Sequence, residues 1–223
     1  MFFDTTRHVK RALSIGLTTI GLAATFALAP TAYAAKVTPK DCKILVLGDS
    51  LSAGYGLSPD QGWVHLMEKR LTEKFPNCSV FNASISGETT AGGKARLDEL
   101  LKTQKPSHMV LELGANDGLR GLSLQVMQDN LRSMIVAARQ NLVQTVLVGM
   151  KIPPNYGPNY TRRFDQTFPT LARKEKVPLV PFMLAGFADK PEAFQADGIH
   201  PNADYQEKVL DNIWPALSGT LTP

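Results

Sequence analysis

The sequence has no long run of charge of one sign and, beyond its first 34 residues, no apolar stretch long enough to span a membrane. Its formal net charge is only +4 over 223 residues, and the Lys and Arg residues are scattered. A nucleic-acid-binding surface is typically built from clustered basic residues, so no nucleic-acid partner is expected. A membrane-spanning helix needs about 20 consecutive apolar residues, so no stable membrane insertion is expected for residues 35–223.

Three motifs that often identify a function are also missing. No His, Cys and carboxylate cluster has the spacing of metal ligands, so neither a metal nor another cofactor is expected. The segment Gly87–Lys94 resembles a phosphate-binding loop, but Lys94 is one position too late and Ala95 replaces the required Ser or Thr. The nucleophile elbow G-x-S-x-G is absent, because Ser52 stands where its second Gly belongs.

The first 34 residues have the features of a secretory signal peptide. A basic head (residues 7–11) precedes an apolar stretch (residues 12–29), and Ala32-Tyr33-Ala34 fits a small-residue cleavage site. The alternative is an N-terminal membrane anchor, but the apolar stretch is short and Pro30 ends it. Residues 1–34 are therefore predicted to be removed, and the rest of the chain is expected to be exported to the periplasm or secreted.

Only two cysteines occur, and each lies just before a strand-like run. Cys42 precedes Lys43–Gly48, and Cys78 precedes the run that ends at Ala83. If the two strands are parallel neighbours, both cysteines lie at the same end of the sheet, within reach of one another. An exported protein folds in an oxidising compartment, which favours a Cys42–Cys78 disulfide over two buried thiols.

Strand-like and helix-like segments alternate along the chain, and no repeat, low-complexity tract or linker interrupts them. This pattern predicts βαβ crossovers and a parallel sheet of about five strands. We therefore expect one α/β domain over residues 35–223, a three-layer α/β/α sandwich. Its strands are expected at residues 43–48, 79–83, 108–113, 145–150 and 177–180, and its helices at 61–75, 91–104, 123–141, 162–176 and 203–217.

Small and polar residues follow the first three predicted strands. Ser50 comes just after an apolar run that ends at Gly48, Gly87 lies in the loop after the second strand, and Asn116 follows the third. Parallel strands place their carboxyl ends at one edge of a sheet, where α/β proteins bind ligands. Taken singly, Ser50 is as well explained by a helix cap, Gly87 by a turn and Asn116 by a loop brace.

Near the C-terminus, Asp197 and His200 stand three residues apart in a segment that contains Gly198 and Pro201. A carboxylate against one imidazole nitrogen fixes the tautomer and leaves the other nitrogen as a base, although a surface pair is the alternative. With these residues at the same edge as Ser50, the set predicts acyl transfer. Ser50 is the nucleophile, His200 the base and Asp197 its orienting partner, and the oxyanion donors are the Ser50 and Gly87 N–H groups and the Asn116 amide.

The segments Gly48-Asp49-Ser50-Leu51-Ser52, Gly87, Gly114–Asp117 and Asp197–His200 resemble the four sequence blocks of the GDSL, or SGNH, hydrolases. The local sequences around Gly87, Asn116 and Pro154 are most similar to those of a bacterial periplasmic group of thioesterases, proteases and lysophospholipases within that family. One departure is Ala115, where that group often has Gly. The resemblance implies a flavodoxin-like SGNH hydrolase fold and hydrolysis of aryl esters, acyl thioesters or lysophospholipids through an acyl-enzyme.

Two loops near the predicted catalytic edge carry apolar and aromatic residues, and Leu119, Arg120, Pro154 and Tyr156 are the candidate substrate-binding residues. The expected substrate carries a short-to-medium acyl chain, and a carbohydrate O-acetyl ester is the alternative substrate. We expect a small-molecule ester or thioester as the partner of a monomeric enzyme. The other two histidines of the exported chain, His65 and His108, are expected to be structural, and Asp49 is expected to hold the Ser50 turn.

Overall fold

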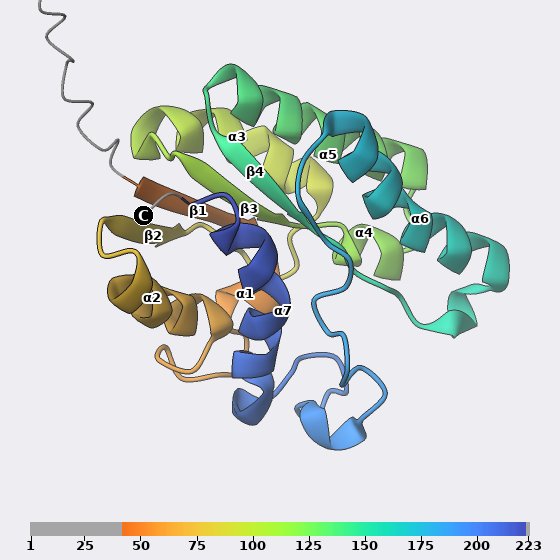
Figure 1. Ribbon diagram of the computed structural model, residues 1–223. Helices are drawn as coiled ribbons and strands as arrows, with labels where there is room; N and C mark the ends of the chain where they lie inside the picture. The colour runs from red at the N-terminus through yellow and green to blue at the C-terminus, as the bar shows by residue number, and fades with distance from the viewer. Residues whose placement is uncertain (1–41, 222–223) are drawn as a thin grey trace, which may run out of the picture. The chain divides into compact units, whose positions relative to one another are not determined.

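The computed structural model describes residues 42–221, and the predicted signal peptide lies outside this range (Figure 1). Strands and helices alternate as expected. The strands are β1 (Cys42–Gly48), β2 (Cys78–Asn82), β3 (His108–Glu112), β4 (Gln144–Val148) and β5 (Leu179–Val180). The helices are α1 (Ser50–Ala53), α2 (Trp63–Lys74), α3 (Thr90–Gln104), α4 (Ala115–Leu119), α5 (Leu124–Gln140), α6 (Pro158–Glu175) and α7 (Gln206–Ser218), with 3₁₀ turns η1 (Pro154–Tyr156), η2 (Pro191–Ala193) and η3 (Ala203–Tyr205).

All five strands are parallel and lie in the order β2-β1-β3-β4-β5. The chain thus starts near the middle of the sheet, adds β2 on one side and then crosses to add β3, β4 and β5 on the other. Ligands of open α/β sheets bind at the carboxyl ends of the strands where the order reverses. Here that point is the carboxyl end of β1 and β3, which are followed by Ser50 and Asn116.

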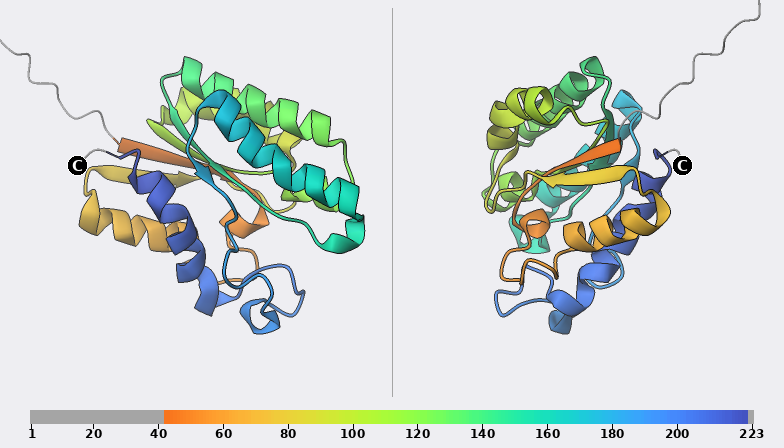
Figure 2. Two further views of the ribbon diagram at one scale, coloured as in Figure 1. Left: turned by 45° about the vertical axis from the view of Figure 1, so that its right-hand side comes forward. Right: turned by 90° about the vertical axis from the view of Figure 1, so that its left-hand side faces the viewer.

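Helices cover both faces of the sheet (Figures 1 and 2). Helices α3, α5 and α6 lie on one face, with α3 against α5 and α5 against α6, while α2 packs beside α7 on the other. The inner strand β1 is covered by both layers and is apolar on both sides, and Ile44 to Leu47 are fully buried. The structure confirms the predicted α/β sandwich and its five-stranded parallel sheet.

The sequence placed several boundaries wrongly and missed two short helices. Strand β5 has two residues where four were expected, and α6 begins at Pro158 instead of residue 162. Proline suits the first helical position because its missing N–H has no acceptor there, so the proline-rich loop ends earlier than predicted. Helices α1 and α4 directly follow β1 and β3, where the sequence predicted loops.

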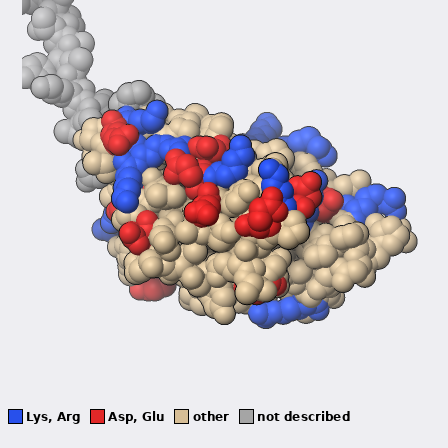
Figure 3. Space-filling view, turned by 90° about the horizontal axis from the view of Figure 1, so that it is seen from below, with Lys and Arg blue, Asp and Glu red and all other residues tan. Residues whose placement is uncertain are grey.

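Acidic and basic side chains are mixed on the face drawn in Figure 3, and a wide area of that face carries neither. Within residues 42–221, no helix is long and apolar enough to cross a membrane.

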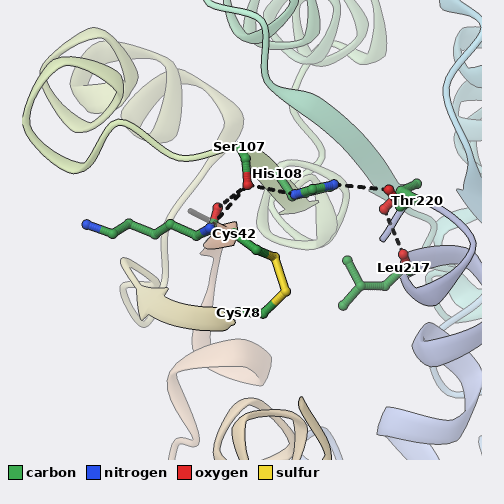
Figure 4. Close-up of a disulfide and its surroundings, with 7 residues drawn as sticks. Cys42, Cys78, Ser107, His108, Leu217 and Thr220 are labelled. Carbon is green, nitrogen blue, oxygen red and sulfur yellow. Dashed lines mark hydrogen bonds between the residues drawn. A yellow bond between two sulfur atoms is a disulfide. The ribbon is translucent and has the colours of Figure 1, made fainter. Parts of the chain in front are cut away.

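The predicted cysteine pair forms a disulfide at the amino end of the sheet (Figure 4). Cys42 and Cys78 are directly paired in the β1–β2 register, with their Cα atoms 4.3 Å apart. His108, at the start of β3, lies nearby between Ser107 Oγ (2.8 Å from Nδ1) and the Thr220 carbonyl oxygen (3.1 Å from Nε2). His108 thus joins the C-terminal segment to the sheet, which fits its predicted structural role. His65 lies on α2 beside Glu68, 3.9 Å from its carboxylate.

Removing the disulfide is expected to lower stability without a comparable loss of catalysis. It closes a loop with a sequence separation of 36, and the chain-entropy model assigns such a loop about 3–4 kcal/mol. Urea unfolding of Cys42→Ala/Cys78→Ala should give a free energy of unfolding lower by about that amount. Its specific activity while folded should stay near that of the parent, because the disulfide lies at the opposite end of β1 from Ser50. An unchanged unfolding midpoint would contradict this account.

Candidate active site

Ser50 begins the short helix α1 immediately after β1. The cap of this helix is Asp49, whose Oδ1 accepts the Leu51 N–H at 3.0 Å. Ser50 is therefore the first helical residue and not the N-cap, which removes the capping alternative. Asp49 itself is buried, and it holds the Ser50 turn as the sequence predicted.

The segment Asp197–His200 brings its two polar side chains to Ser50. His200 Nε2 lies 2.8 Å from Ser50 Oγ, and His200 Nδ1 lies 2.7 Å from Asp197 Oδ2. The other carboxylate oxygen, Asp197 Oδ1, accepts the backbone N–H groups of Ile199 (2.9 Å) and His200 (3.1 Å). Gly198 occupies the turn at a φ of +67°, a region that glycine enters without strain. The pair is thus built into one tight turn.

These contacts determine where the protons lie. A carboxylate can only accept, so His200 Nδ1 carries the hydrogen that it donates to Asp197, and Nε2 accepts the Ser50 hydroxyl hydrogen. Burial opposes ionisation of Asp197, but the Ile199 N–H and the His200 side chain outweigh it and lower the pKa of Asp197 to about 2. Asp197 is therefore ionised across the ordinary working range of an enzyme. His200 is left as a base directed at Ser50.

The three predicted oxyanion donors belong to the segments that follow β1, β2 and β3. Within the described part of the chain, the backbone N–H groups of Ser50 and Gly87 donate to no other residue. Gly87 follows β2 at a φ of +78°, so a side chain at that position would be strained. Asn116, in α4, donates one amide hydrogen to Asp49 Oδ2 at 3.0 Å and has a second to give.

Side chains connect the loops that follow β1, β2 and β3. Asp117 is buried and accepts the Thr90 N–H at 2.8 Å, which joins α4 to the start of α3. Arg120 Nη2 donates to the Gly87 carbonyl oxygen at 2.8 Å. This bond braces the Gly87 loop, and Arg120, a predicted substrate-binding residue, does not line the cavity beside Ser50.

A cavity of about 540 Å³ opens beside Ser50 and His200. Its size is that of a small-molecule site. Of the predicted substrate-binding residues, Leu119 and Pro154 line it. Tyr156 does not line it, and its hydroxyl donates to the Leu119 carbonyl oxygen at 2.7 Å, which braces the segment that carries Leu119. The other apolar residues of the wall include Met150, Ile152, Phe182, Leu184 and Phe194.

Sequence reasoning missed two residues at this site. Glu112 ends β3 directly beneath the Ser50 turn and is fully buried. The sequence feature that could have identified Glu112 is a carboxyl group within a predicted strand of mainly apolar residues. Tyr55 stacks at a tilt on the His200 ring, with centroids 4.7 Å apart, and no feature of the sequence pointed to that contact. Within residues 42–221, no group of three or more His, Cys, Asp and Glu side chains is arranged to hold a metal ion.

The chain is similar to known proteins in both sequence and fold. The model of the GDSL-like lipase/acylhydrolase family matches residues 46–208. The chain is 48% identical to the esterase TesA of Pseudomonas aeruginosa over 80% of this chain and 89% of that protein. It is 42% identical to thioesterase 1/protease 1/lysophospholipase L1 of Escherichia coli K12, over 75% and 79% of the two chains. A crystal structure of TesA, 47% identical, superposes with a TM-score of 0.78 over 80% of this chain and 99% of that one.

Replacing Asp197 by Asn is expected to lower kcat by roughly 10²- to 10⁴-fold, with a small change in KM. An amide in this position can donate to Nδ1 and stabilise the tautomer in which Nε2 carries the hydrogen and cannot accept from Ser50. Steady-state kinetics of Asp197→Asn on an aryl ester tests this. Asp60→Asn, which removes the same charge at an exposed turn, serves as the control. Wild-type kcat in Asp197→Asn would refute the assigned role.

The lowered pKa of Asp197 also predicts how stability changes with pH. The pKa of Asp197 is about 2 in the folded protein, below its ordinary value of 3.8. Ionised Asp197 therefore stabilises the folded state at pH values above 3.8, and this stabilisation is lost as the pH falls toward 2. The side chain is 35% exposed, so solvent screening makes the effect small. The difference in Tm between the parent and Asp197→Asn should shrink between about pH 6 and pH 2. A difference that grows on acidification would contradict the shift.

Proposed function

The chain belongs to the GDSL-like lipase/acylhydrolase family and is an ester hydrolase, and we propose that Ser50, His200 and Asp197 perform its chemistry. The observation that carries the proposal is the 2.8 Å contact between His200 Nε2 and Ser50 Oγ, beside a cavity large enough for an acyl group. A serine hydroxyl is a weak nucleophile unless an adjacent base removes its proton. Here that base is present and oriented.

In the first half of the reaction, Ser50 Oγ attacks the carbonyl carbon while its proton moves to His200 Nε2. Asp197 stabilises the imidazolium that forms. The negative charge on the former carbonyl oxygen is stabilised by the Ser50 and Gly87 N–H groups and the Asn116 amide. When the tetrahedral intermediate collapses, His200 gives its proton to the departing oxygen or sulfur atom, and the acyl group stays on Ser50.

In the second half, a water molecule replaces the leaving group. His200 takes a proton from this water as it attacks the acyl carbon, and the same three donors stabilise the second oxyanion. Collapse releases the carboxylic acid and returns the proton to Ser50 Oγ. The proposed mechanism uses no cofactor, because the protons are carried by His200 and the charge by N–H donors.

The apolar wall of the cavity supports a short-to-medium acyl chain as the group that is transferred. We propose aryl esters, acyl-CoA thioesters and lysophospholipids as the substrate classes. The alternative, a carbohydrate O-acetyl ester, is not favoured, since an acetyl group would leave most of the wall formed by residues such as Ile152, Phe182 and Phe194 in contact with water. The esterase and thioesterase relatives described above point the same way.

We further propose that the enzyme acts as an exported, periplasmic monomer made of residues 35–223. The N-terminal signal pattern supports export, as does a disulfide, which forms and persists in oxidising compartments. N-terminal sequencing of the exported protein is expected to begin at residue 35, and its mass in solution is expected to be that of one chain. An N-terminus at Met1 would refute the cleavage.

Ser50→Ala is expected to remove ester hydrolysis while the fold is kept. Loss of the nucleophile in a serine hydrolase lowers kcat by roughly 10⁴-fold or more. Release of p-nitrophenol from p-nitrophenyl butyrate measures the effect, and Ser58→Ala, an exposed serine eight positions further on, is the matched control. Near-normal turnover by Ser50→Ala would reject the mechanism.

The cavity predicts a dependence on acyl length. Each methylene buried against its wall contributes about 0.8 kcal/mol, which corresponds to about a fourfold rise in kcat/KM. A series of p-nitrophenyl esters from acetate upward should show this rise until the chain outgrows the cavity. Acyl-CoA and acetylated xylan assayed beside the series separate the thioester and carbohydrate alternatives. A steady fall from acetate onward would instead favour an acetyl esterase.

A further inference from the structure

The buried carboxyl of Glu112 lies directly beneath the nucleophile. Glu112 pairs with Gly48 in the β1–β3 register, and a side chain at Gly48 would place its Cβ 2.7 Å from Glu112 Oε2. Oε2 accepts the Ser52 hydroxyl at 2.7 Å and the Asp49 N–H at 3.3 Å. Two residues that flank Ser50 are therefore held by one oxygen atom. Glycine before Asp49 leaves the space that this oxygen needs.

The second oxygen of Glu112 shows which form of the acid is present. Oε1 is buried, and as an ionised carboxylate oxygen it has no hydrogen-bond donor among the described residues. An ionised, fully buried carboxylate without a compensating partner is unstable. Burial, followed by the nearby charge of Asp49, raises the pKa of Glu112 well above its ordinary value. Protonation removes this uncompensated charge, and it makes Glu112 a hydrogen-bond donor beside the neighbouring Asp49 carboxylate.

Asp49 connects this proton to the oxyanion site. Its Oδ1 accepts from the Leu51 N–H and its Oδ2 from Asn116 Nδ2, so the carboxylate fixes both the turn and the amide. Burial raises the pKa of Asp49 to about 6, although the Leu51 N–H, the charge of His200 and the Asn116 amide favour its ionised form. If both acids were ionised, they would repel one another in a buried space, and Asp49 would be pushed away from Asn116.

We propose that Glu112 is a positioning residue that keeps a proton on Oε1 and, through Asp49, aims the Asn116 amide and the Ser50 turn at the oxyanion. The inference rests on the proposed function, since it assigns a support to the same site. Glu112 contacts no reacting atom. Its contribution is to keep Asp49 in place, so its loss affects the transition state more than substrate binding.

Two substitutions separate this role from simple core packing. Glu112→Gln keeps an acceptor for Ser52 and Asp49 N–H and puts an N–H donor where the proton stood, so kcat on p-nitrophenyl butyrate is expected within about threefold of the parent. Glu112→Leu fills the space without polar groups, and kcat is expected to fall by about 10- to 100-fold, less than removal of an oxyanion donor costs. KM should change little in either variant.

Glu175 provides the matched control. It is also buried, but Arg132 (2.9 Å) and Arg139 (3.2 Å) contact its carboxylate, and these hydrogen bonds outweigh burial and lower its pKa. Glu175→Gln is expected to lower Tm and leave kcat unchanged, whereas Glu112→Gln is expected to keep both. The two variants are expected to differ in Tm because Glu175 is ionised and paired with arginines, whereas Glu112 is neutral.

Infrared spectroscopy tests the proton independently of activity. The parent at neutral pH should show the carbonyl band of a protonated carboxylic acid, which is lost in Glu112→Gln and kept in Glu175→Gln. Absence of the band, or a Glu112→Gln variant as impaired in kcat as Glu112→Leu, would overturn the proposal, as would unchanged kcat in Glu112→Leu. If the parent fails to hydrolyse the ester, the proposed function is wrong. The infrared band still shows in that case whether Glu112 is protonated.

Discussion

The parallel pairing of β1 with both β2 and β3 is the constraint on which the site depends. It places the residues after three strands at one edge of the sheet, although Ser50, Gly87 and Asn116 are far apart in the sequence. The register at the opposite end is fixed covalently, because Cys42 and Cys78 are paired and joined. A slip of β2 by one residue would turn its side chains to the other face and displace the Gly87 loop. The sheet therefore sets the positions of the oxyanion donors before any side chain contributes.

Within that frame, a single carboxylate links the nucleophile to the oxyanion donors. Asp49 accepts from Leu51 in α1 and from Asn116 in α4, the helix that follows the neighbouring strand β3. Because both loops bind the same side chain, a movement of one displaces the other. Such rigidity suits an oxyanion site, where donors must be oriented before charge develops. The Asp197–His200 turn has a separate origin, in its own backbone hydrogen bonds to Asp197.

The chemistry could be predicted from sequence because it uses local patterns. An apolar strand that ends in Gly48-Asp49-Ser50, and an Asp and a His three residues apart, are visible without coordinates. The substrate wall could not be predicted in the same way. It combines residues from the segments after β3, β4 and β5. Whether a side chain such as that of Arg120 or Tyr156 lines the cavity or bonds to a neighbouring loop depends on packing between distant segments. Helices α1 and α4 were missed because their few residues show no helical periodicity.

Charge state is a further property that the sequence does not carry. Glu112 and Glu175 are both glutamates with little or no exposure, and the groups that contact each carboxylate come from segments distant in the sequence. In the structure, two arginines contact Glu175, and ionisation is favoured there. Glu112 lies beside the Asp49 carboxylate and accepts from two uncharged donors, both at Oε2, so the neutral acid fits and the ionised one does not. The negative charge beneath the nucleophile therefore resides on Asp49, the carboxylate that Asn116 contacts. A second charge there would weaken the stabilisation of the oxyanion, which is why a neutral acid suits this position.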